Sequence, residues 1–324
     1  MASFESCGNA HASEVGVNSQ RAMTRMIWGA LAIFTLVDAM GLWETRLRIE
    51  QSGLLTYIGS FSVLAAIVLF YQTTQRSVRI MRCAHSVLQL EVLACLILIA
   101  TYVAAAARYP LRDSWFLQAD SAVGFDLAVW TTWVNAHLAV HVILWAIYNA
   151  LFPVTLMACM YLALSESADE FIATVFVTSI ILVAIALMVP AVGRRNGAPH
   201  VGQFLALREG TLRTVLLSDS RGLIMFPSFH AALAILVPIS IRKGRRWLFL
   251  AGATFAALTM VSALSEGGHY LVDVAAGAAV ACASATAISW AVAPTARRRD
   301  SGSAYRRPRP TGQSTVPEYA QPFD

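Results

Sequence analysis

Charged residues are scarce in this sequence. Of its 324 residues, 57% are hydrophobic and only 13% are Asp, Glu, Lys or Arg. Soluble domains carry roughly 25% charged residues, so water is not the main solvent of this chain. Apolar runs recur between residues 26 and 291, and several reach the ~20 residues with which a helix crosses ~30 Å of hydrocarbon. The lack of charge therefore predicts an all-α fold, a polytopic membrane helical bundle.

Cysteine is also sparse, and its spacing excludes two classes of site. The five cysteines are scattered without a Cys-x-x-Cys pair, which indicates neither a zinc site nor a disulfide framework. No convincing small-residue cleavage site follows the first apolar run, so this run is predicted to be an uncleaved anchor after a polar cytoplasmic N-terminus at residues 1–25. No internal repeat is evident.

Eight segments are predicted to span the membrane, and a ninth is too short to do so. The predicted spans are 26–43, 53–72, 86–106, 137–163, 171–190, 229–241, 247–264 and 270–292. The short apolar stretch at 127–134 is predicted to lie along the membrane or to re-enter it. The chain thus divides into N-terminal transmembrane helices at 26–106, a membrane domain at 107–293 and a disordered basic tail at 294–324.

The distribution of arginine predicts an orientation. With the N-terminus in the cytoplasm, 15 of the 24 basic residues fall in cytoplasmic segments, as the positive-inside bias requires. The loop at 191–228 breaks this bias, because it holds five arginines on the predicted outer side. Nucleic acid is not an expected partner, because the basic residues form short clusters between apolar runs. We expect a multi-pass protein of the inner or plasma membrane with both termini in the cytoplasm.

A histidine and an aspartate stand at the predicted start of the last span, where an ionisable group is costly and is a candidate for function. His269 and Asp273 are four residues apart, so a helix places them on one face and the carboxylate can accept the Nδ1 proton. Nε2 then keeps a lone pair that can take a proton or attack an electrophile. Gly267 and Gly268 would let backbone amides approach a bound phosphate at the helix N-terminus. The same pair could also be a packing ion pair.

A second polar group stands at the predicted start of the span at 229–241. Pro227 suits a first helical turn, Ser228 can cap the helix or donate its hydroxyl, and His230 lies beside the free amides of this end. Guanidinium groups match phosphate oxygens in pairs, which would explain the excess of arginine in the preceding loop. The candidate phosphate-binding arginines are Arg208, Arg213 and Arg221. Taken alone, the Pro-Ser step could simply start a helix.

Two further groups are weaker candidates. His137 and His141 are also four residues apart, but two histidines without a third ligand are too few to predict a metal site. Asp120 and Asp126 could contact a polar head group, although side chains of a solvated loop are the better interpretation.

The two polar groups together resemble motifs of a known family. Phe-Pro-Ser-Phe-His at 226–230 and His-Tyr-Leu-Val-Asp at 269–273, whose histidines are 39 residues apart, resemble the second and third motifs of the type-2 phosphatidic acid phosphatase superfamily. Phe between Ser and His, and Tyr after the second His, are similar to the inositol phosphorylceramide synthase branch. The stretch 208–277 carries the match. The family's first motif, Lys-x6-Arg-Pro, is absent, and Ser262-Ala263 stands where the third motif often has Ser-Arg.

The resemblance implies a six-helix core and a phosphatase or phosphotransferase that acts on a lipid phosphate, and the distribution of arginine predicts that its site lies at the non-cytoplasmic face. In it His269 attacks phosphorus, Asp273 orients His269, and His230 protonates the departing oxygen. A phosphohistidine forms and passes its phosphoryl group to water or to an alcohol, and no metal or other cofactor is implied. Membrane lipids are the expected partners, and no protein partner is indicated. The alternative is a non-catalytic lipid-phosphate binder or transporter that retains the pocket.

Overall fold

The computed structural model describes residues 2–193, 199–219 and 222–304. Within these ranges the chain forms eleven α-helices and one pair of two-residue strands. The helices are α1 (Ala2–Thr45), α2 (Gln51–Thr74), α3 (Val78–Ala106), α4 (Asp113–Ala122), α5 (Leu127–Ala136), α6 (Leu138–Leu164), α7 (Ala168–Met188), α8 (Pro199–Glu209), α9 (Phe229–Ile241), α10 (Arg246–Ser265) and α11 (Leu271–Ala304). The chain divides into two compact units, Met1–Ile288 and Ser289–Asp324, and the architecture below is that of the first.

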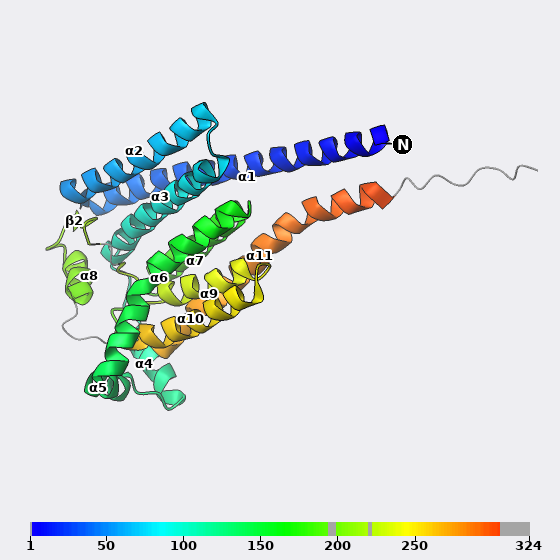
Figure 1. The fold of residues 1–324 in the computed structure, drawn as a ribbon. Helices are drawn as coiled ribbons and strands as arrows, with labels where there is room; N and C mark the ends of the chain where they lie inside the picture. The colour runs from blue at the N-terminus through cyan, green and yellow to red at the C-terminus, as the bar shows by residue number, and fades with distance from the viewer. Residues whose placement is uncertain (1, 194–198, 220–221, 305–324) are drawn as a thin grey trace, which may run out of the picture. The chain divides into compact units, whose positions relative to one another are not determined.

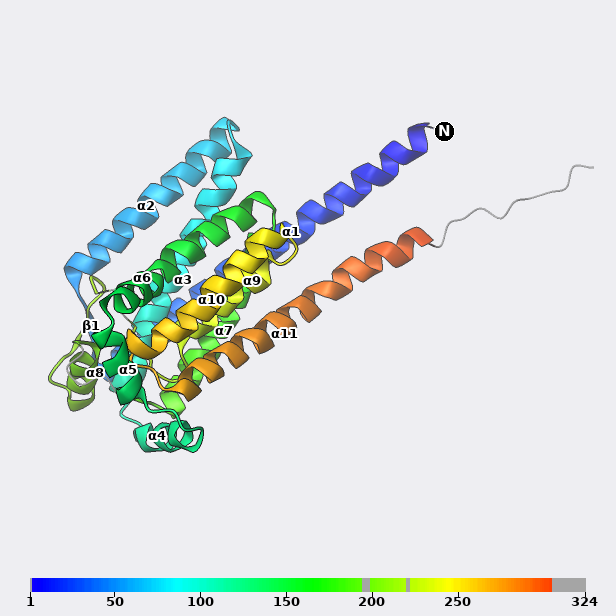
Figure 2. The same ribbon diagram turned by 60° about the horizontal axis from the view of Figure 1, so that its bottom comes forward.

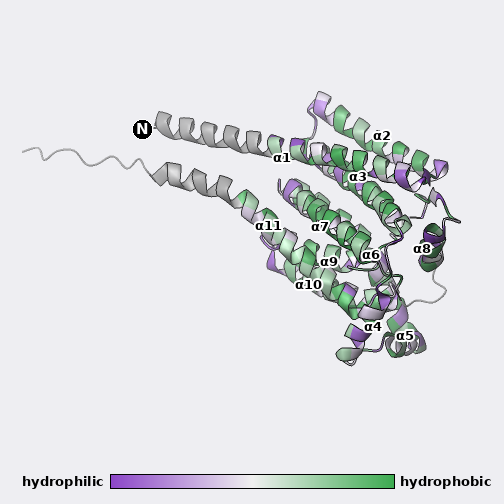
Figure 3. Cartoon of the chain, turned by 180° about the vertical axis from the view of Figure 1, so that it is seen from behind, coloured by the Kyte–Doolittle hydropathy of each residue, from purple (hydrophilic) through white to green (hydrophobic). Residues whose placement is uncertain are grey.

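The long helices of the first unit lie alongside one another as a bundle (Figures 1 and 2). The short helices α4, α5 and α8 gather at one end of this bundle, together with the strand pair and the starts of α9 and α11 (Figures 1 and 2). We call this end the site end. Figure 3 shows hydrophobic residues along the long helices and hydrophilic residues mainly at helix ends and in connecting segments.

Seven helices in the described part of the chain are long and apolar enough to cross a membrane. These spans are Arg21–Thr45, Gln51–Thr74, Val78–Ala106, Leu138–Leu164, Ala168–Met188, Arg246–Ser265 and Leu271–Val292. The remaining predicted span, 229–241, corresponds to α9, an apolar helix of only 13 residues, which covers ~20 Å at 1.5 Å per residue. The predicted all-α membrane bundle is confirmed, and the short stretch at 127–134 is found in the ten-residue helix α5.

The two sides of the helices differ as they do in membrane proteins. Large apolar side chains such as Trp43 and Leu138 are 86% and 73% exposed, and exposed apolar surface on this scale marks contact with lipid in a chain so poor in charge. The short helix α9 is instead buried among α6, α7 and α10, with small residues such as Ala231 and Ala234 fully inaccessible. The helix that carries one candidate histidine therefore lies inside the bundle.

The predicted loop at 191–228 contains a helix and a strand where described. Helix α8 occupies Pro199–Glu209. Strand β2 (Thr214–Val215) pairs in parallel with β1 (Arg48–Ile49), which connects α1 to α2 along the chain. Beside this pair, Glu50 accepts hydrogen bonds from the Ser218 amide and hydroxyl, and these bonds lower the pKa of Glu50 below its usual value. The segment that leads toward α9 is thus tied to the N-terminal helices.

Parts of the predicted N-terminal segment and of the predicted C-terminal tail are helical in the structure. Residues 2–25, predicted as a polar segment, form the first part of α1, and α11 continues past Pro294 to Ala304. The rest of the predicted tail, 305–324, lies outside the described residues.

Candidate active site

The starts of α9 and α11 meet directly at the site end. The Ser228 amide, at the N-cap of α9, donates to the Asp273 carbonyl oxygen at 2.9 Å. One turn farther along α11, any side chain at Gly277 would overlap the Ser228 carbonyl oxygen. This glycine lets the two backbones approach each other, and the approach brings the two predicted motifs together.

Three side chains form a line in this contact. The His269 Nδ1 lies 3.4 Å from the Asp273 Oδ2, and the His269 Nε2 lies 3.3 Å from the Ser228 Oγ. Asp273 and Ser228 are fully buried, and His269 is 3% exposed. Because a carboxylate can only accept, Nδ1 carries the proton in this arrangement and Nε2 is left to accept from the serine hydroxyl. The predicted His269–Asp273 pair is therefore present as geometry, with Ser228 on its reactive side.

His230 faces the same cluster from α9. Its ring centroid lies 6.4 Å from that of His269, and its ring stacks on Tyr148 of α6 at 4.2 Å and 9°. Phe152, one turn along α6, meets the His230 ring edge-on. The two aromatic side chains fix the plane of this imidazole. The structure thus brings both predicted histidines and the aspartate to one place.

Two glycines precede His269 at positions where a side chain would be strained. At Gly267 an added Cβ would lie 2.6 Å from the Ala263 carbonyl oxygen, 2.7 Å from the His269 Cδ2 and 3.3 Å from Nε2, so a side chain here would displace the backbone or the imidazole. Gly268 has a φ of +69°, a left-handed conformation that favours glycine. The role predicted for Gly268, phosphate binding through its amide, stays a prediction.

The amides that begin α11 are already occupied. Asp273 accepts from the Tyr270 amide at 2.9 Å, and Asp120 accepts from the Leu271 and Val272 amides at 3.1 and 3.4 Å. The expectation that Asp120 is a solvated loop residue is wrong, because it is 3% exposed and caps α11 from α4. Asp126 instead caps its own helix, α5, through the Ala128 amide. An anion would find the start of α11 filled by carboxylates.

A second carboxylate of α4 holds the neighbouring segments. Asp113 accepts hydrogen bonds from the amides of Val192 and Gly193 and from the hydroxyl of Tyr270. On the same helix, Phe116 stacks on Phe226 with 4.4 Å between ring centroids. Sequence patterns do not reveal Asp113 or Asp120 as site residues, because their partners lie about 80 to 157 residues away in the chain. Helix α4 therefore braces the start of α11.

The start of α9 contrasts with that of α11. The Ser228 hydroxyl accepts from the Ala231 amide at 3.3 Å, and the Ser228 carbonyl accepts from Ala232. Among the described residues, no partner is found for the amides of Phe229 and His230, which as the first two of a helix point along its axis, out of its N-terminal end. These amides lie beside the Ser228–His269 contact and suit an anion.

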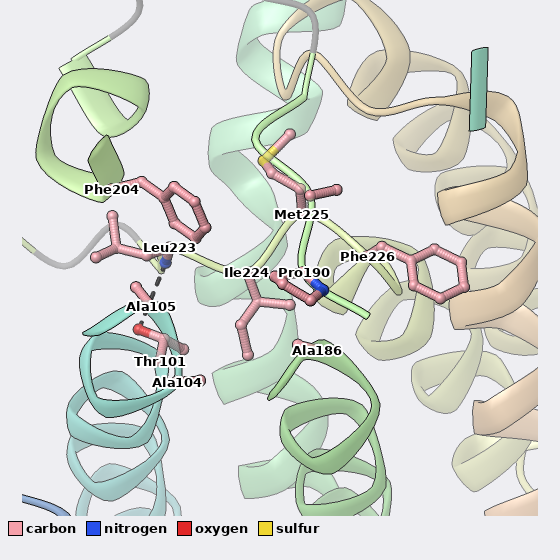
Figure 4. Close-up of a pocket in the computed structure, with 11 residues that line it drawn as sticks. Thr101, Ala104, Ala105, Ala186, Pro190, Phe204, Leu223, Ile224, Met225 and Phe226 are labelled. Atoms are coloured by element: carbon pink, nitrogen blue, oxygen red, sulfur yellow. Dashed lines mark hydrogen bonds between the residues drawn. The ribbon is translucent and has the colours of Figure 1, made fainter. Parts of the chain in front are cut away.

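The segment that enters α9 is anchored on its other side by α3. The Leu223 amide donates to the Thr101 Oγ1 at 3.4 Å across a small cavity (Figure 4). The side chains around this cavity are otherwise apolar, with Phe226 at one edge and Phe204 of α8 at another (Figure 4). The cavity offers no ionisable group and is distinct from the histidine cluster.

Two of the predicted phosphate-binding arginines have other partners in the described structure. The Arg208 Nη2 donates to the Tyr109 carbonyl oxygen at 2.6 Å, and the Arg213 Nε donates to the Gly210 carbonyl oxygen at 3.2 Å. Burial and the charge of Arg108 lower the pKa of Arg208. No described contact joins Arg208 or Arg213 to His269, and Arg221 lies outside the described residues. Their phosphate contacts stay predictions.

The histidines at the start of α6 have separate partners. The His137 Nδ1 lies 2.7 Å from the Trp133 carbonyl oxygen, whereas the His141 Nε2 lies 3.5 Å from the Glu266 Oε2. In the described part of the chain, no group of three or more His, Cys, Asp or Glu side chains is placed to hold a metal ion.

One comparison with known proteins identifies a family. A family model described as PAP2 superfamily matches residues 114–287, a range that begins in α4 and includes both histidines and Asp273. No curated protein and no solved structure matches the chain.

Proposed function

Because the chain belongs to the PAP2 superfamily, we propose that it is a membrane lipid phosphate phosphatase or phosphotransferase that works through a phosphohistidine on His269. The observation that carries the proposal is the buried line from Asp273 through His269 to Ser228, with His230 facing it. An oriented imidazole with a lone pair on Nε2 is a nucleophile.

In the first half-reaction the His269 Nε2 attacks the phosphorus of a lipid phosphate. The N–P bond forms as the P–O bond to the leaving group breaks, and protonated His230 gives its proton to the departing oxygen. The His269 Nδ1 keeps its proton, and Asp273 stabilises the positive charge that develops on the ring. The phosphoryl oxygens take the place of the Ser228 contact at Nε2, and the serine hydroxyl then donates to one of them.

The start of α9 supplies the donors that hold the phosphoryl group. The amides of Phe229 and His230 are oriented by the helix before substrate arrives, so little reorganisation accompanies the reaction. The helix dipole adds positive potential at the same point. Arg208, Arg213, Arg221 and the Gly268 amide are further proposed contacts, which substrate would have to draw toward the cluster.

In the second half-reaction an acceptor hydroxyl attacks the phosphohistidine. The N–P bond breaks, the acceptor's proton passes to His230, and both histidines return to their starting state. Water as acceptor gives a phosphatase, and an alcohol gives a phosphotransferase. The motif variant similar to inositol phosphorylceramide synthases favours an alcohol.

We place this chemistry at the non-cytoplasmic face. The distribution of arginine supports this orientation, with the loop at 191–228 outside and the 242–246 cluster inside. The head group would enter from the site end while the lipid tail lies against the exposed apolar side chains of the helices.

The second candidate is a non-catalytic lipid-phosphate binder or transporter. One observation favours it: the family's first motif, Lys-x6-Arg-Pro, is absent from the chain. The geometry of His269 and Asp273 favours catalysis, because phosphate binding alone needs neither a fixed tautomer nor a lone pair on Nε2.

A substrate panel in purified, membrane-reconstituted protein tests the proposal. Lipid phosphates are assayed with and without inositol and other alcohols, and both phosphate release and transfer are measured. The wild type and the exposed-site control His137→Gln should be active, and His269→Ala should lose at least about 10⁴-fold in turnover. Full residual activity in His269→Ala would remove it as the nucleophile. Specific binding without turnover across the panel would favour the binder or transporter.

A further inference from the structure

One face of helix α6 carries a histidine and two aromatic side chains that face the candidate active site. His141, Tyr148 and Phe152 are spaced by seven and four residues, which places them on one side of the helix. Tyr148 and Phe152 contact the ring of His230. His141 lies about two turns, ~10 Å, nearer the start of α6. It therefore lies farther toward the site end than His230 does.

The partner of His141 is a residue of the nucleophile's own turn. The Glu266 Oε2 lies 3.5 Å from the His141 Nε2. Glu266 immediately precedes Gly267, where an added Cβ would lie 3.3 Å from the His269 Nε2. The side chain of Glu266 is 6% exposed, whereas that of His141 is 36% exposed. The pair thus runs from the edge of the nucleophile to the surface.

The charge of this pair does not suit a phosphate. A buried carboxylate repels an anion next to it, and the repulsion is stronger in a low-dielectric site than in water. Its chemistry suits hydroxyl groups better. When the His141 Nε2–H donates to Glu266, Nδ1 is left as an acceptor, and no described hydrogen bond occupies it. A carboxylate and an imidazole nitrogen can then accept from two hydroxyls of one molecule.

We propose that His141 and Glu266 form the acceptor subsite, which binds a neutral polyhydroxylated alcohol and directs one of its hydroxyls at the phosphohistidine. The inference rests on the proposed function and names its second substrate class. The reacting hydroxyl attacks phosphorus, the N–P bond to His269 breaks, and the hydroxyl proton passes to His230. His141 and Glu266 accept hydrogen bonds from the hydroxyls that do not react, and no bond to either residue changes.

A chase of the isolated phosphoenzyme tests this subsite apart from the first half-reaction. Wild type, His141→Gln, Glu266→Gln and the control His137→Gln are labelled with a lipid phosphate, and unreacted donor is removed. Loss of label is then followed in water alone and with inositol or glycerol. An amide is a weaker acceptor than a carboxylate and replaces one acceptor atom by an N–H donor. Both pair variants should therefore form phosphoenzyme and hydrolyse it at the wild-type rate within about threefold, but lose alcohol-stimulated transfer by about tenfold or more.

Each other outcome has a separate meaning. Wild-type transfer to alcohols in both pair variants would overturn the subsite, and so would a wild type that transfers to no alcohol. Loss of phosphoenzyme formation in both variants would also overturn it, because the pair would then act in the first half-reaction or in folding. Absence of any phosphoenzyme in active wild-type protein would instead refute the proposed function itself.

Discussion

Two helices begin at the same cluster, and their first turns are built in opposite ways. At the start of α11, the amides of Tyr270, Leu271 and Val272 are taken by the carboxylates of Asp273 and Asp120. At the start of α9, a neutral serine caps one amide and no described partner occupies the first two. Both ends have the positive potential of a helix N-terminus, but only α9 leaves it available to a ligand.

This difference between the two helix starts suggests that each has a separate role. Carboxylates at the start of α11 hold the imidazole of His269 and exclude an anion from that end. Open amides at the start of α9 can hold the phosphoryl group beside Nε2. The sequence predicts that the starts of both helices bind phosphate, because each has glycine or serine beside a histidine. Substitutions at the start of either helix test this proposed division of roles.

Asp273→Asn should have the largest effect. An amide in place of the carboxylate no longer fixes the Nδ1–H tautomer of His269 or balances its developing charge, and comparable changes in catalytic triads lower turnover about 10⁴-fold. Single-turnover formation of phosphoenzyme measures the loss. The matched control is Asp126→Asn, which alters the cap of α5. If turnover stays within tenfold of wild type, Asp273 is not the orienting group.

Gly267→Ala should follow in size. Its methyl group would lie 2.7 Å from the His269 Cδ2 and 3.3 Å from Nε2, and a shift of ~1 Å at a nucleophile can cost about 10²-fold in rate. The control is Gly59→Ala in α2, where an added Cβ meets nothing within 4 Å. Equal activity of the two variants would contradict the claim that Gly267 sets the position of the His269 imidazole.

Ser228→Ala probes the α9 side. It removes a donor to the phosphoryl oxygens and the cap of the Ala231 amide, so the rate of phosphoenzyme formation should fall about 10- to 10²-fold. Loss of the cap should lower the free energy of unfolding by about 1 kcal/mol. Unchanged kinetics with lowered stability would leave Ser228 as a helix cap alone.

Asp120→Ala should have the smallest effect on the chemistry. It uncaps two amides of α11 and should lower the free energy of unfolding by about 1–2 kcal/mol, with turnover within about fivefold of wild type at temperatures where the protein is folded. Thermal unfolding in detergent and a lipid phosphate assay give the two numbers. A catalytic loss as large as that of Asp273→Asn would contradict the proposal that Asp120 only caps α11 while Asp273 orients His269.

The sequence predicted the parts of this site that depend on local order. Hydropathy marks the long helices, and the spacing of His269 and Asp273 places them on one helical face whatever the rest of the chain does. Contacts between distant segments cannot be predicted from local sequence. Gly277, for example, has no distinguishing sequence pattern, and its role becomes evident only where its helix contacts Ser228.

The carboxylates show the same limit. Asp120 lies 151 residues from the amide it caps, and nothing in its local sequence distinguishes it from the solvated residue it was expected to be. Glu266 and His141 are paired only because α6 and the turn after α10 adjoin in the bundle. The charge and position of Arg208 and Arg213 predict phosphate contacts, but in the structure both side chains donate to carbonyl oxygens of the chain.

The atom that carries the phosphoryl group tests the division of roles most directly. Active protein is quenched during turnover of a labelled lipid phosphate, digested under alkaline conditions that preserve phosphohistidine, and the labelled peptide is analysed by mass spectrometry and phosphorus NMR. Because Nδ1 faces Asp273 and Nε2 faces Ser228, the label should lie on the Nε2 of His269. A label on Nδ1, on His230 or on another residue would contradict the proposal.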